Sequence, residues 1–375
     1  MTVQDTELTR SGHSINPDTR AALEELFAGL GTDRIEHLTF FASPEHDREI
    51  IAEVLRERAP GLATGCTTAG EIGPKGYCRD GMVVEAVLPG RLATHRFSFE
   101  NVRDAAPDIY REARAEFDRR RAYPERKLRE DCFGVLLVDG LSQCEERVVA
   151  ALWDQFDGMP IVGGSAGDNW QFRAAPVFAG DRFLERGAAL VIFEMGGTPF
   201  RTFRLQDFKP ISAQMVVTNA APDERIIYEI DGEPAFDVYA REIGLPSHKI
   251  SDDVFSQYSL LTQIGGEDYI RSVRGVEGGG LSLHAAIDIG VVIRLGKSDE
   301  TIATLAEQFG AAEPRTNASC MVFDCVHRQL ELRRQGTLER AAEILGGLGA
   351  VGFSTYGEFA DSVHVNQTMT GVCIG

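Results

Sequence analysis

The chain carries Gly65-Cys66-Thr67-Thr68-Ala69-Gly70-Glu71 at the end of a short apolar segment. The pattern returns 97 positions later as Val162-Gly163-Gly164-Ser165-Ala166-Gly167-Asp168, and 287 positions later as Gly352-Phe353-Ser354-Thr355-Tyr356-Gly357-Glu358. Each copy places a hydroxyl residue two positions before a glycine and an acid directly after that glycine. A recurring strand-to-loop junction of this kind predicts a fold that arose by internal duplication.

The three loops are candidates for the mouth of a ligand site. Glycine permits close backbone approach, hydroxyls donate and accept hydrogen bonds, and a carboxylate can fix an amine or a buried donor. The alternative is that these are tight turns whose hydroxyls and acids satisfy their own backbone. The threefold recurrence favours a shared pocket. The candidate ligand-binding residues are Cys66, Thr67, Thr68, Gly70, Glu71, Gly164, Ser165, Gly167, Asp168, Asn169, Ser354, Thr355, Tyr356, Glu358 and Asn366.

The order of apolar patterns predicts an α/β (mixed α+β) fold with two related halves, each a mixed β-sheet with flanking helices. We expect residues 1–16 to be a loose tail and residues 17–33 to hold a first helix. The segments 82–88 and 92–99, joined by Pro89-Gly90-Arg91, predict an antiparallel hairpin. A single helix is expected over 330–345. The predicted domains are residues 34–208 and 209–375, following the tail and first helix at 1–33.

Composition narrows the function. Lys and Arg total 38 against 57 Asp and Glu, and the net charge of −19 argues against nucleic acid and membrane surfaces as partners. Seven scattered cysteines without a CxxC pair do not resemble a disulfide framework or a zinc site. No signal peptide or long apolar span is visible, so we expect a cytoplasmic protein without membrane insertion.

The three loops, together with His364-Val365-Asn366-Gln367-Thr368, resemble the FIST family of sensory proteins. The likeness runs from about residue 34 to the end of the sequence. It implies a FIST N-terminal and a FIST C-terminal domain, both α/β, and a small-ligand sensor in signal transduction rather than an enzyme.

The resemblance extends to the stand-alone nitric oxide sensing members, which bind haem and regulate a separate histidine kinase. It therefore implies haem, nitric oxide and a kinase or other signalling partner, and it leaves a homodimer possible. A haem sensor needs an axial ligand, most simply a histidine. His364 is the first candidate, within the polar HVNQT motif, and His327 beside Cys325 is the second. No CxxCH occurs, which excludes covalent c-type attachment.

Two alternatives remain open. One is a haem-free sensor of a small metabolite such as an amino acid, with Trp170 and Phe172 either stacking on the ligand or covering the core. The other is a serine hydrolase, since Gly163-Gly164-Ser165-Ala166-Gly167 satisfies G-x-S-x-G. That elbow requires a helix directly after the serine, and the following residues show no helical period. A serine hydrolase is therefore the weaker of the two alternative hypotheses.

Overall fold

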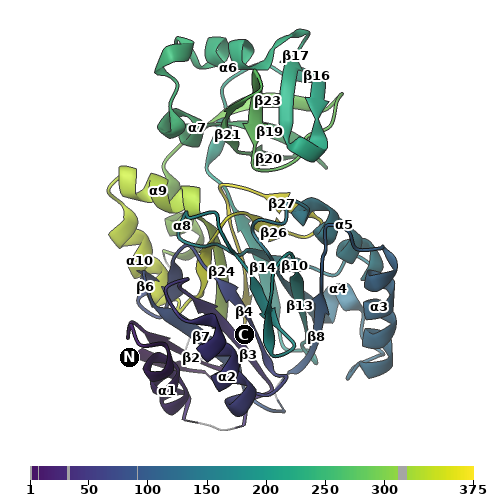
Figure 1. Cartoon of the computed structure of the whole chain (residues 1–375), viewed down its shortest axis with the longest axis vertical. Coiled ribbons are helices and arrows are strands. Elements are labelled where there is room, and N and C mark those ends of the chain that lie inside the picture. Colours follow the sequence, from purple (N-terminus) through teal and green to yellow (C-terminus); the bar gives the residue numbers. More distant parts are fainter. Residues whose placement is uncertain (1, 7, 32–33, 91, 311–318) are drawn as a thin grey trace.

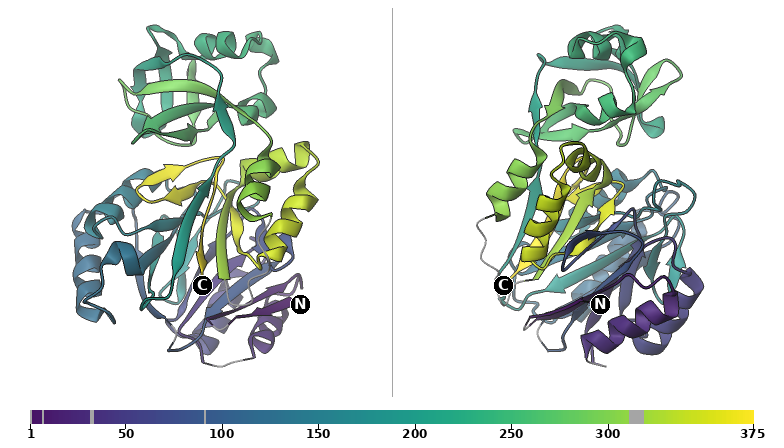
Figure 2. Two further views of the ribbon diagram at one scale, coloured as in Figure 1. Left: turned by 180° about the vertical axis from the view of Figure 1, so that it is seen from behind. Right: turned by 90° about the vertical axis from the view of Figure 1, so that its left-hand side faces the viewer.

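The computed structural model describes residues 2–6, 8–31, 34–90, 92–310 and 319–375. Their path forms a large lower body and a smaller domain above it (Figures 1 and 2). The upper domain consists of residues 211–298, which leave the body along one strand and return to it, and we call it the insert. The body is made of the chain before and after the insert.

Three related β-α-β units build the body, and in each unit the two strands lie side by side in parallel. A further strand runs antiparallel to the first strand of each unit. The strands are buried and apolar, and the amphipathic helices that join them cover the sheets and complete the core. The units comprise β3 (His37–Ala42), α2 (Arg48–Arg58), β4 (Ala63–Thr67) and β7 (Met82–Val87); β9 (Cys132–Val138), α5 (Glu145–Gln155), β10 (Ile161–Ser165) and β13 (Ala188–Glu194); and β24 (Ser319–Cys325), α9 (Val326–Arg334), α10 (Leu338–Gly347), β25 (Val351–Thr355) and β28 (Met369–Ile374).

A small hairpin follows the second strand of each unit and completes the sheet of a different unit. The hairpin of the first unit joins the third, that of the second joins the first, and that of the third joins the second. The exchange is cyclic, so the three strand-to-hairpin loops cross at the middle of the body. The hairpins are β5 (Glu71–Gly73) with β6 (Gly76–Cys78), β11 (Val177–Ala179) with β12 (Arg182–Leu184), and β26 (Glu358–Ala360) with β27 (Val363–Val365).

The remaining elements extend these sheets or cover them. The first sheet has the order β1-β2-β7-β3-β4-β11-β12, the second β27-β26-β10-β9-β13-β8 and the third β14-β28-β24-β25-β5-β6. Helices lie on the outer faces (Figure 1). The additional elements are β1 (Thr2–Asp5), β2 (Thr9–Ser14), α1 (Thr19–Leu30), β8 (Ala93–Phe99), α3 (Asp108–Arg120), α4 (Leu128–Asp131), β14 (Phe200–Leu205) and α8 (Thr301–Phe309).

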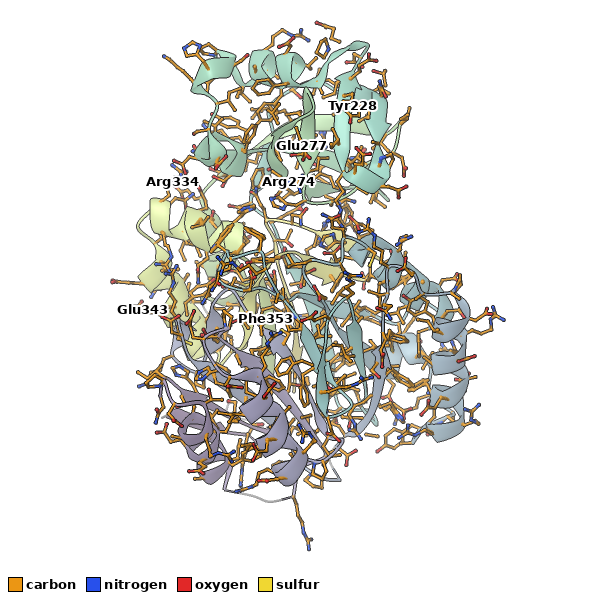
Figure 3. All side chains as sticks on the ribbon, in the orientation of Figure 1. Tyr228, Arg274, Glu277, Arg334, Glu343 and Phe353 are labelled. Carbon is orange, nitrogen blue, oxygen red and sulfur yellow. A yellow bond between two sulfur atoms is a disulfide. The ribbon has the colours of Figure 1, made fainter. Side chains whose placement is uncertain are left out.

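One core cluster contains side chains of all three units. Phe41 of the first unit stacks on Phe353 of the third with ring centroids 4.8 Å apart, and both rings are fully buried. Phe353 lies near the middle of the body in projection (Figure 3). Burial of such rings contributes about 2–3 kcal/mol each, so the units stabilise one another through their shared centre.

The sheet of the insert has nine strands: seven follow the order β20-β19-β23-β16-β17-β22-β21, β15 pairs with β23, and β18 pairs with β17. Its own core packs α6 against the sheet. Its elements are β15 (Phe208–Pro210), β16 (Met215–Ala221), η1 (Pro222–Glu224), β17 (Ile226–Ile230), β18 (Glu233–Pro234), α6 (Ala235–Ile243), η2 (Ser247–Lys249), α7 (Asp252–Gln257), β19 (Tyr258–Ile264), β20 (Glu267–Arg271), β21 (Val273–Glu277), β22 (Gly280–Leu283) and β23 (Val292–Ser298), where β15 belongs to the connecting strand.

A buried ion network holds the connection between body and insert. Asp207, on the link from β14 to β15, lies 3.2 Å from the guanidinium of Arg328 on α9. The Arg328 Nε atom also lies 3.0 Å from Asp324, whose carboxylate accepts a 2.5 Å hydrogen bond from Tyr77. Because all of these charges are buried, the link is tied to α9 by interactions that are costly to break singly.

The predicted fold class, mixed α/β with helix-flanked mixed sheets, is confirmed, but two local predictions are wrong. Residues 2–5 and 9–14 are not part of a loose tail, since they pair as β1 and β2 at the edge of the first sheet. The segments 82–88 and 92–99 are strands but not a hairpin. β7 pairs with β2 and β3, whereas β8 pairs with β13 in the second sheet. Arg91 of the expected turn lies outside the described residues.

Two further corrections concern the third unit. The helix expected over 330–345 is two helices, because Gly336 takes a left-handed φ of 68° between α9 and α10. The expectation of no disulfide is also wrong. Cys320 and Cys373 face each other across β24 and β28 with Cα atoms 4.2 Å apart, and they form a disulfide. Their separation of 53 positions hid that pairing in the sequence.

Candidate functional site

The three glycine–acid loops meet at the middle of the body, as their recurrence predicted. Each loop is bound to the other two by backbone hydrogen bonds, because the exchanged hairpins bring the ends of β4, β10 and β25 together. Representative bonds run from Ser354 N to Gly70 O (2.7 Å), from Gly167 N to Thr67 O (3.0 Å) and from Tyr356 N to Ser165 O (3.1 Å). Gly164 is needed at this crossing, since a Cβ there would lie 2.4 Å from the Thr355 methyl group.

Two of the three loop acids, Glu71 and Glu358, accept hydrogen bonds from groups of the protein itself, including the hydroxyl three positions earlier in the same loop. Glu71 accepts hydrogen bonds from the Thr68 hydroxyl (2.5 Å) and from the Gly81 N–H (3.1 Å). Glu358 accepts from the equivalent Thr355 hydroxyl and from Thr368. Burial raises the pKa of Glu71 to about 7 and that of Glu358 to about 8. These acids stabilise the loops; near neutral pH Glu358 is largely protonated and Glu71 is about half protonated.

The third acid, Asp168, behaves differently. Its carboxylate accepts a 2.6 Å hydrogen bond from the Tyr356 hydroxyl and further bonds from the N–H groups of residues 172, 173 and 174. Burial opposes its ionisation, but these hydrogen bonds outweigh it and lower the pKa of Asp168 overall. Asp168 is therefore a charged residue that shapes the loop carrying Trp170 and Phe172.

A pocket opens beside this loop, where the body meets the insert. Its interior space is about 60 Å³. Its wall is formed by two of the repeat loops, the residues around the start of α5, the first turn of α9 and two residues of the insert. The lining residues are Gly140, Glu145, Trp170, Phe172, Arg225, His284, Val326, His327 and Tyr356.

Aromatic faces form one side of the pocket. The rings of Phe172 and Tyr356 stack with centroids 5.0 Å apart, and Trp170 lies 6.1 Å from Phe172. Trp170 is also 5.5 Å from His327, which in turn is 5.0 Å from His284. Phe172 is 53% exposed and lies at the mouth of the pocket. This arrangement suits a small ligand with a flat or charged group.

Charged groups form the other side. Arg225 of the insert donates to Glu145 (2.6 Å) and Glu146 (2.8 Å) on α5. Burial lowers the pKa of Arg225, but the two carboxylates outweigh this effect and raise it overall. Glu146 also accepts the backbone N–H of Ala286, so this ion group is a direct link between insert and body.

Both pocket histidines are neutral at physiological pH. Burial lowers the pKa of His327 to about 4. The pKa of His284 is well below its usual range, first because of burial and then because of nearby His327 and arginine side chains. Each neutral imidazole keeps one nitrogen that can accept a hydrogen bond.

The sequence predicted a pocket lined by all three loops, but no residue of the first loop, 65–71, belongs to the wall of this pocket, and most of the other predicted site residues are outside it as well. Of the predicted set, Tyr356 and His327 line the pocket, and Asp168 holds the loop that does. The hydroxyls of Thr67, Ser165 and Ser354 and the amide of Asn366 are buried without a hydrogen-bond partner in the described part of the chain. Cys66 is fully buried in the core on β4, and burial raises its thiol pKa far above the usual value. Glycines 70 and 167 and Asn169 carry the inter-loop backbone contacts.

Ser165 does not lie in the strand–turn–helix arrangement that a hydrolase nucleophile needs. A loop, not a helix, follows β10, and the buried Ser165 hydroxyl has no base bonded to it among the described residues. Both features differ from a nucleophile elbow, which exposes its serine between a strand and a helix.

Haem does not fit the two candidate histidines as they stand. The His364 ring is buried, with Nδ1 3.5 Å from Glu146, and a Cβ added at Gly357 would lie only 2.2 Å from Nε2. Both of its nitrogens thus face protein groups. His327 lies in the 60 Å³ pocket, whereas sites for drug-sized ligands span about 300–1,000 Å³. In the described residues, no cluster of three or more metal-ligating side chains is present.

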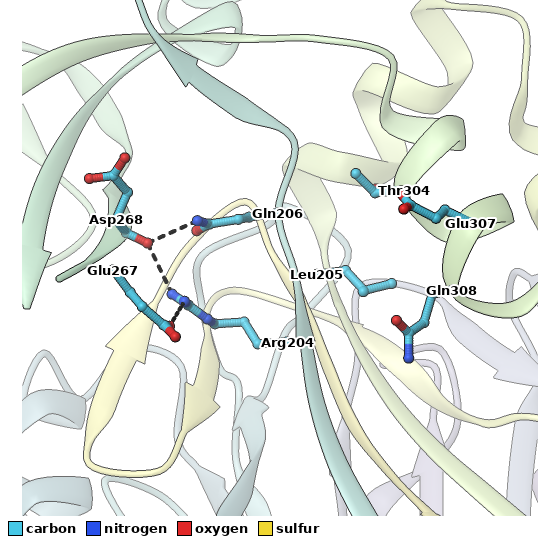
Figure 4. A pocket seen from close by; sticks show the side chains of 8 residues that line it. All are labelled: Arg204, Leu205, Gln206, Glu267, Asp268, Thr304, Glu307 and Gln308. Carbon is cyan, nitrogen blue, oxygen red and sulfur yellow. Dashed lines mark hydrogen bonds and ion pairs between the residues drawn. The ribbon is translucent and has the colours of Figure 1, made fainter. Parts of the chain in front are cut away.

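A second, larger hollow of about 560 Å³ lies at the connection to the insert (Figure 4). Arg204 and Gln206 of the connecting strand bind the backbone oxygen of Asp268, and Arg204 also bonds Glu267. The opposite wall is α8, with Thr304, Glu307 and Gln308. The wall is polar, and its arginine is already bound to the insert.

Sequence reasoning missed Glu145 and Arg225 as site residues and left open whether His284 faces a pocket or the solvent. They come from α5 and from the insert, without a motif around any of them. The pairing with Arg225, 80 positions away, needed the fold.

Comparison with known protein families supports the family resemblance that the repeat loops indicated. The family model described as FIST N domain matches residues 37–233, and the one described as FIST C domain matches residues 235–361. A search of curated proteins returned no match. Within the described ranges, no helix combines the length and apolarity needed to cross a bilayer. Since the two matches together take in most of the sequence, the chain belongs to the FIST family of small-ligand sensory domains in signal transduction.

Proposed function

We propose that this chain senses a small organic ligand bound, without haem, in the pocket between the repeat loops and the insert. The observation that carries the proposal is the make-up of the pocket wall: Trp170 and Tyr356 come from the loops, His327 from α9, and Arg225 and His284 from the insert. A ligand that touches all of these groups favours the arrangement in which insert and body are together. Such differential binding is what a sensor requires.

The signal would leave through the insert. The insert is joined to the body by two chain crossings and by the ion group of Arg225, Glu145 and Glu146. Ligand binding therefore changes how firmly the insert is held. A separate signalling protein, with a histidine kinase as the expected class, would read that change. An amino acid is one metabolite that the pocket could accept.

The test is thermal stabilisation by a panel of small metabolites, in the wild-type chain and in two tryptophan variants. Trp170→Ala removes a pocket wall. Trp153→Ala, on α5 and outside the pocket lining, is the matched control at the other tryptophan. A true ligand raises the melting temperature of the wild type and of Trp153→Ala but not of Trp170→Ala. Equal stabilisation of all three proteins by every active compound would refute the proposal.

The haem and nitric oxide prediction has its own measurement. Protein supplied with haemin is examined by absorption spectroscopy, alongside His364→Ala and His327→Ala. A Soret band that disappears in either variant would establish haem ligation at that residue and would require the local packing to open. A spectrum of free haemin in all three proteins excludes both histidines as ligands.

A further inference from the structure

We propose that the body contains a second binding site, a buried site beside Gly70 for one uncharged hydrogen-bonding molecule, namely water. The site is formed by the first loop (65–71), the third loop (352–358) and α9. It is separate from the pocket described above and goes beyond the proposed function. Three features point to it: the room beside Gly70, the polar atoms around that room and the pairing of the charged groups nearby.

The three equivalent glycines of the repeat differ in the room beside them. A Cβ added at Gly167 would lie 2.9 Å from the backbone nitrogen of Ala69, and one added at Gly357 would lie 2.2 Å from the His364 ring. At Gly70 the nearest atoms would be 3.6 Å away, which is an ordinary van der Waals distance. Of these three glycines, Gly70 is therefore the one with room for a further group about the size of water.

Polar atoms surround this room. The three atoms nearest to the added Cβ would be the carbonyl oxygen of Cys78 and the Ser354 Oγ atom, both at 3.6 Å, and the Gln329 Nε2 atom at 3.7 Å. Ser354 is 0% exposed and Gln329 is 2% exposed. Within the described residues, neither Ser354 Oγ nor Gln329 Nε2 has a hydrogen-bond partner. Because an unpaired buried polar group is costly, a molecule that bonds both atoms stabilises the folded chain.

The donors and acceptors of the site match those of water. The amide nitrogen of Gln329 donates, the Ser354 hydroxyl either donates or accepts, and the Cys78 carbonyl oxygen has two lone pairs that accept. One water molecule can accept from the amide, donate to the carbonyl and share a bond with the hydroxyl. About three hydrogen bonds are typical of a water molecule buried in a protein.

The charged groups nearby are already paired, which favours an uncharged molecule over an ion. The carboxyl group of Glu71 accepts two hydrogen bonds from protein groups. Asp324 lies beside Ser354 on the neighbouring strand. Its carboxylate accepts hydrogen bonds from Tyr77 and Arg328. An ion in the site would have to displace one of these bonds.

The site also connects α9 with the repeat loops. Gln329 lies in the first turn of α9, two positions after His327 of the pocket wall. It directly follows Arg328, which binds Asp207 on the link to the insert. Hydrogen bonds through the bound molecule therefore fix this turn of α9 on the first and third loops.

A crystal structure at a resolution that shows ordered waters tests the site directly. We expect density for a single atom within about 3 Å of Ser354 Oγ, Gln329 Nε2 and the carbonyl oxygen of Cys78. Three results would overturn the proposal: no density while the side chains keep these positions, a direct hydrogen bond between Ser354 and Gln329, or density for a larger molecule.

A double-mutant cycle tests the site in solution. Ser354→Ala and Gln329→Met each remove one partner of the bound molecule, and urea unfolding measures the folding equilibrium constant. Each change should lower that constant about tenfold. The double variant should be about fivefold more stable than the product of the two effects, because the two side chains share one molecule.

Ser165→Ala is the matched control for this cycle. The Ser165 hydroxyl is also fully buried without a partner among the described residues, but it belongs to the second loop. Its effect should combine additively with that of Gln329→Met. Additive effects of Ser354→Ala and Gln329→Met would contradict a shared molecule, and if these variants do not fold, the crystal structure of the wild type decides.

Discussion

Glu358 gives the sharpest test of how the repeat loops are stabilised. Its carboxyl group is fully buried and accepts hydrogen bonds from two threonines, and burial raises its pKa to about 8 from an ordinary value of 4.5. The folded chain therefore keeps a proton that the unfolded chain releases above pH 4.5. The stabilisation is complete below that pH and is lost as the pH rises through about 8.

The size of the effect follows from these two values. Between pH 6 and pH 8, the contribution of Glu358 to the free energy of unfolding falls by about 2 kcal/mol. Glu71, with a pKa of about 7, adds a fall of about 1 kcal/mol over the same interval. Glutamine has nearly the same shape as a protonated glutamate but does not ionise. In Glu358→Gln the loss of stability between pH 6 and pH 8 should thus be about 2 kcal/mol smaller than in the wild type.

Urea unfolding followed by circular dichroism at pH 6, 7 and 8 measures this difference. Asp168→Asn is the matched control, because the lowered pKa of Asp168 leaves it ionised in both folded and unfolded chains across this interval. The difference in unfolding free energy between Asp168→Asn and the wild type should therefore be about the same at every pH. Parallel curves for the wild type and Glu358→Gln would refute the idea that Glu358 is protonated in the folded chain.

Three further changes test the body of the fold, each by urea unfolding. Arg328→Met leaves two buried carboxylates without their cation and should cost about 3–5 kcal/mol, whereas a loss under 1 kcal/mol would show that the network is open to water. Replacing both Cys320 and Cys373 by alanine should cost about 2–4 kcal/mol, and a reductant should then have no effect on the variant; an unchanged midpoint would contradict the bond. Gly352→Ala places a Cβ 1.6 Å from the nearest carbonyl oxygen and should cost about 3 kcal/mol or more, so a fully stable variant would disprove that strand contact.

The sequence was sufficient for the local elements and for the repeat. The first helix, expected within residues 17–33, runs over Thr19–Leu30, and the buried face of α5 follows its apolar period. The glycine–acid pattern could be recognised because it involves only residues that are neighbours along the chain. In the structure, the carbonyl oxygens of Gly70 and Gly357 accept hydrogen bonds from other repeat loops at the crossing. Periodicity records which side of an element is buried, and that information is local.

Pairing between distant elements could not be predicted in the same way. β7 and β8 are neighbours in the chain with a turn signal between them, yet their partners are β3 and β13 in different sheets. The tail strands pair by backbone hydrogen bonds, which leave no apolar pattern in a polar sequence. The pocket depends on Arg225 of the insert, and no spacing in the sequence shows that it reaches α5.

The cyclic exchange of hairpins has a consequence for how the chain acquires its structure. The sheet containing β9, β10 and β13 gains its last two strands from β26 and β27, almost two hundred positions further along. No single unit can bury its edges before the others are present, so contacts of long sequence separation dominate the body. Such topologies form slowly and expose unpaired edges meanwhile. During synthesis, the early units are therefore expected to depend on chaperones until β26 and β27 have been made.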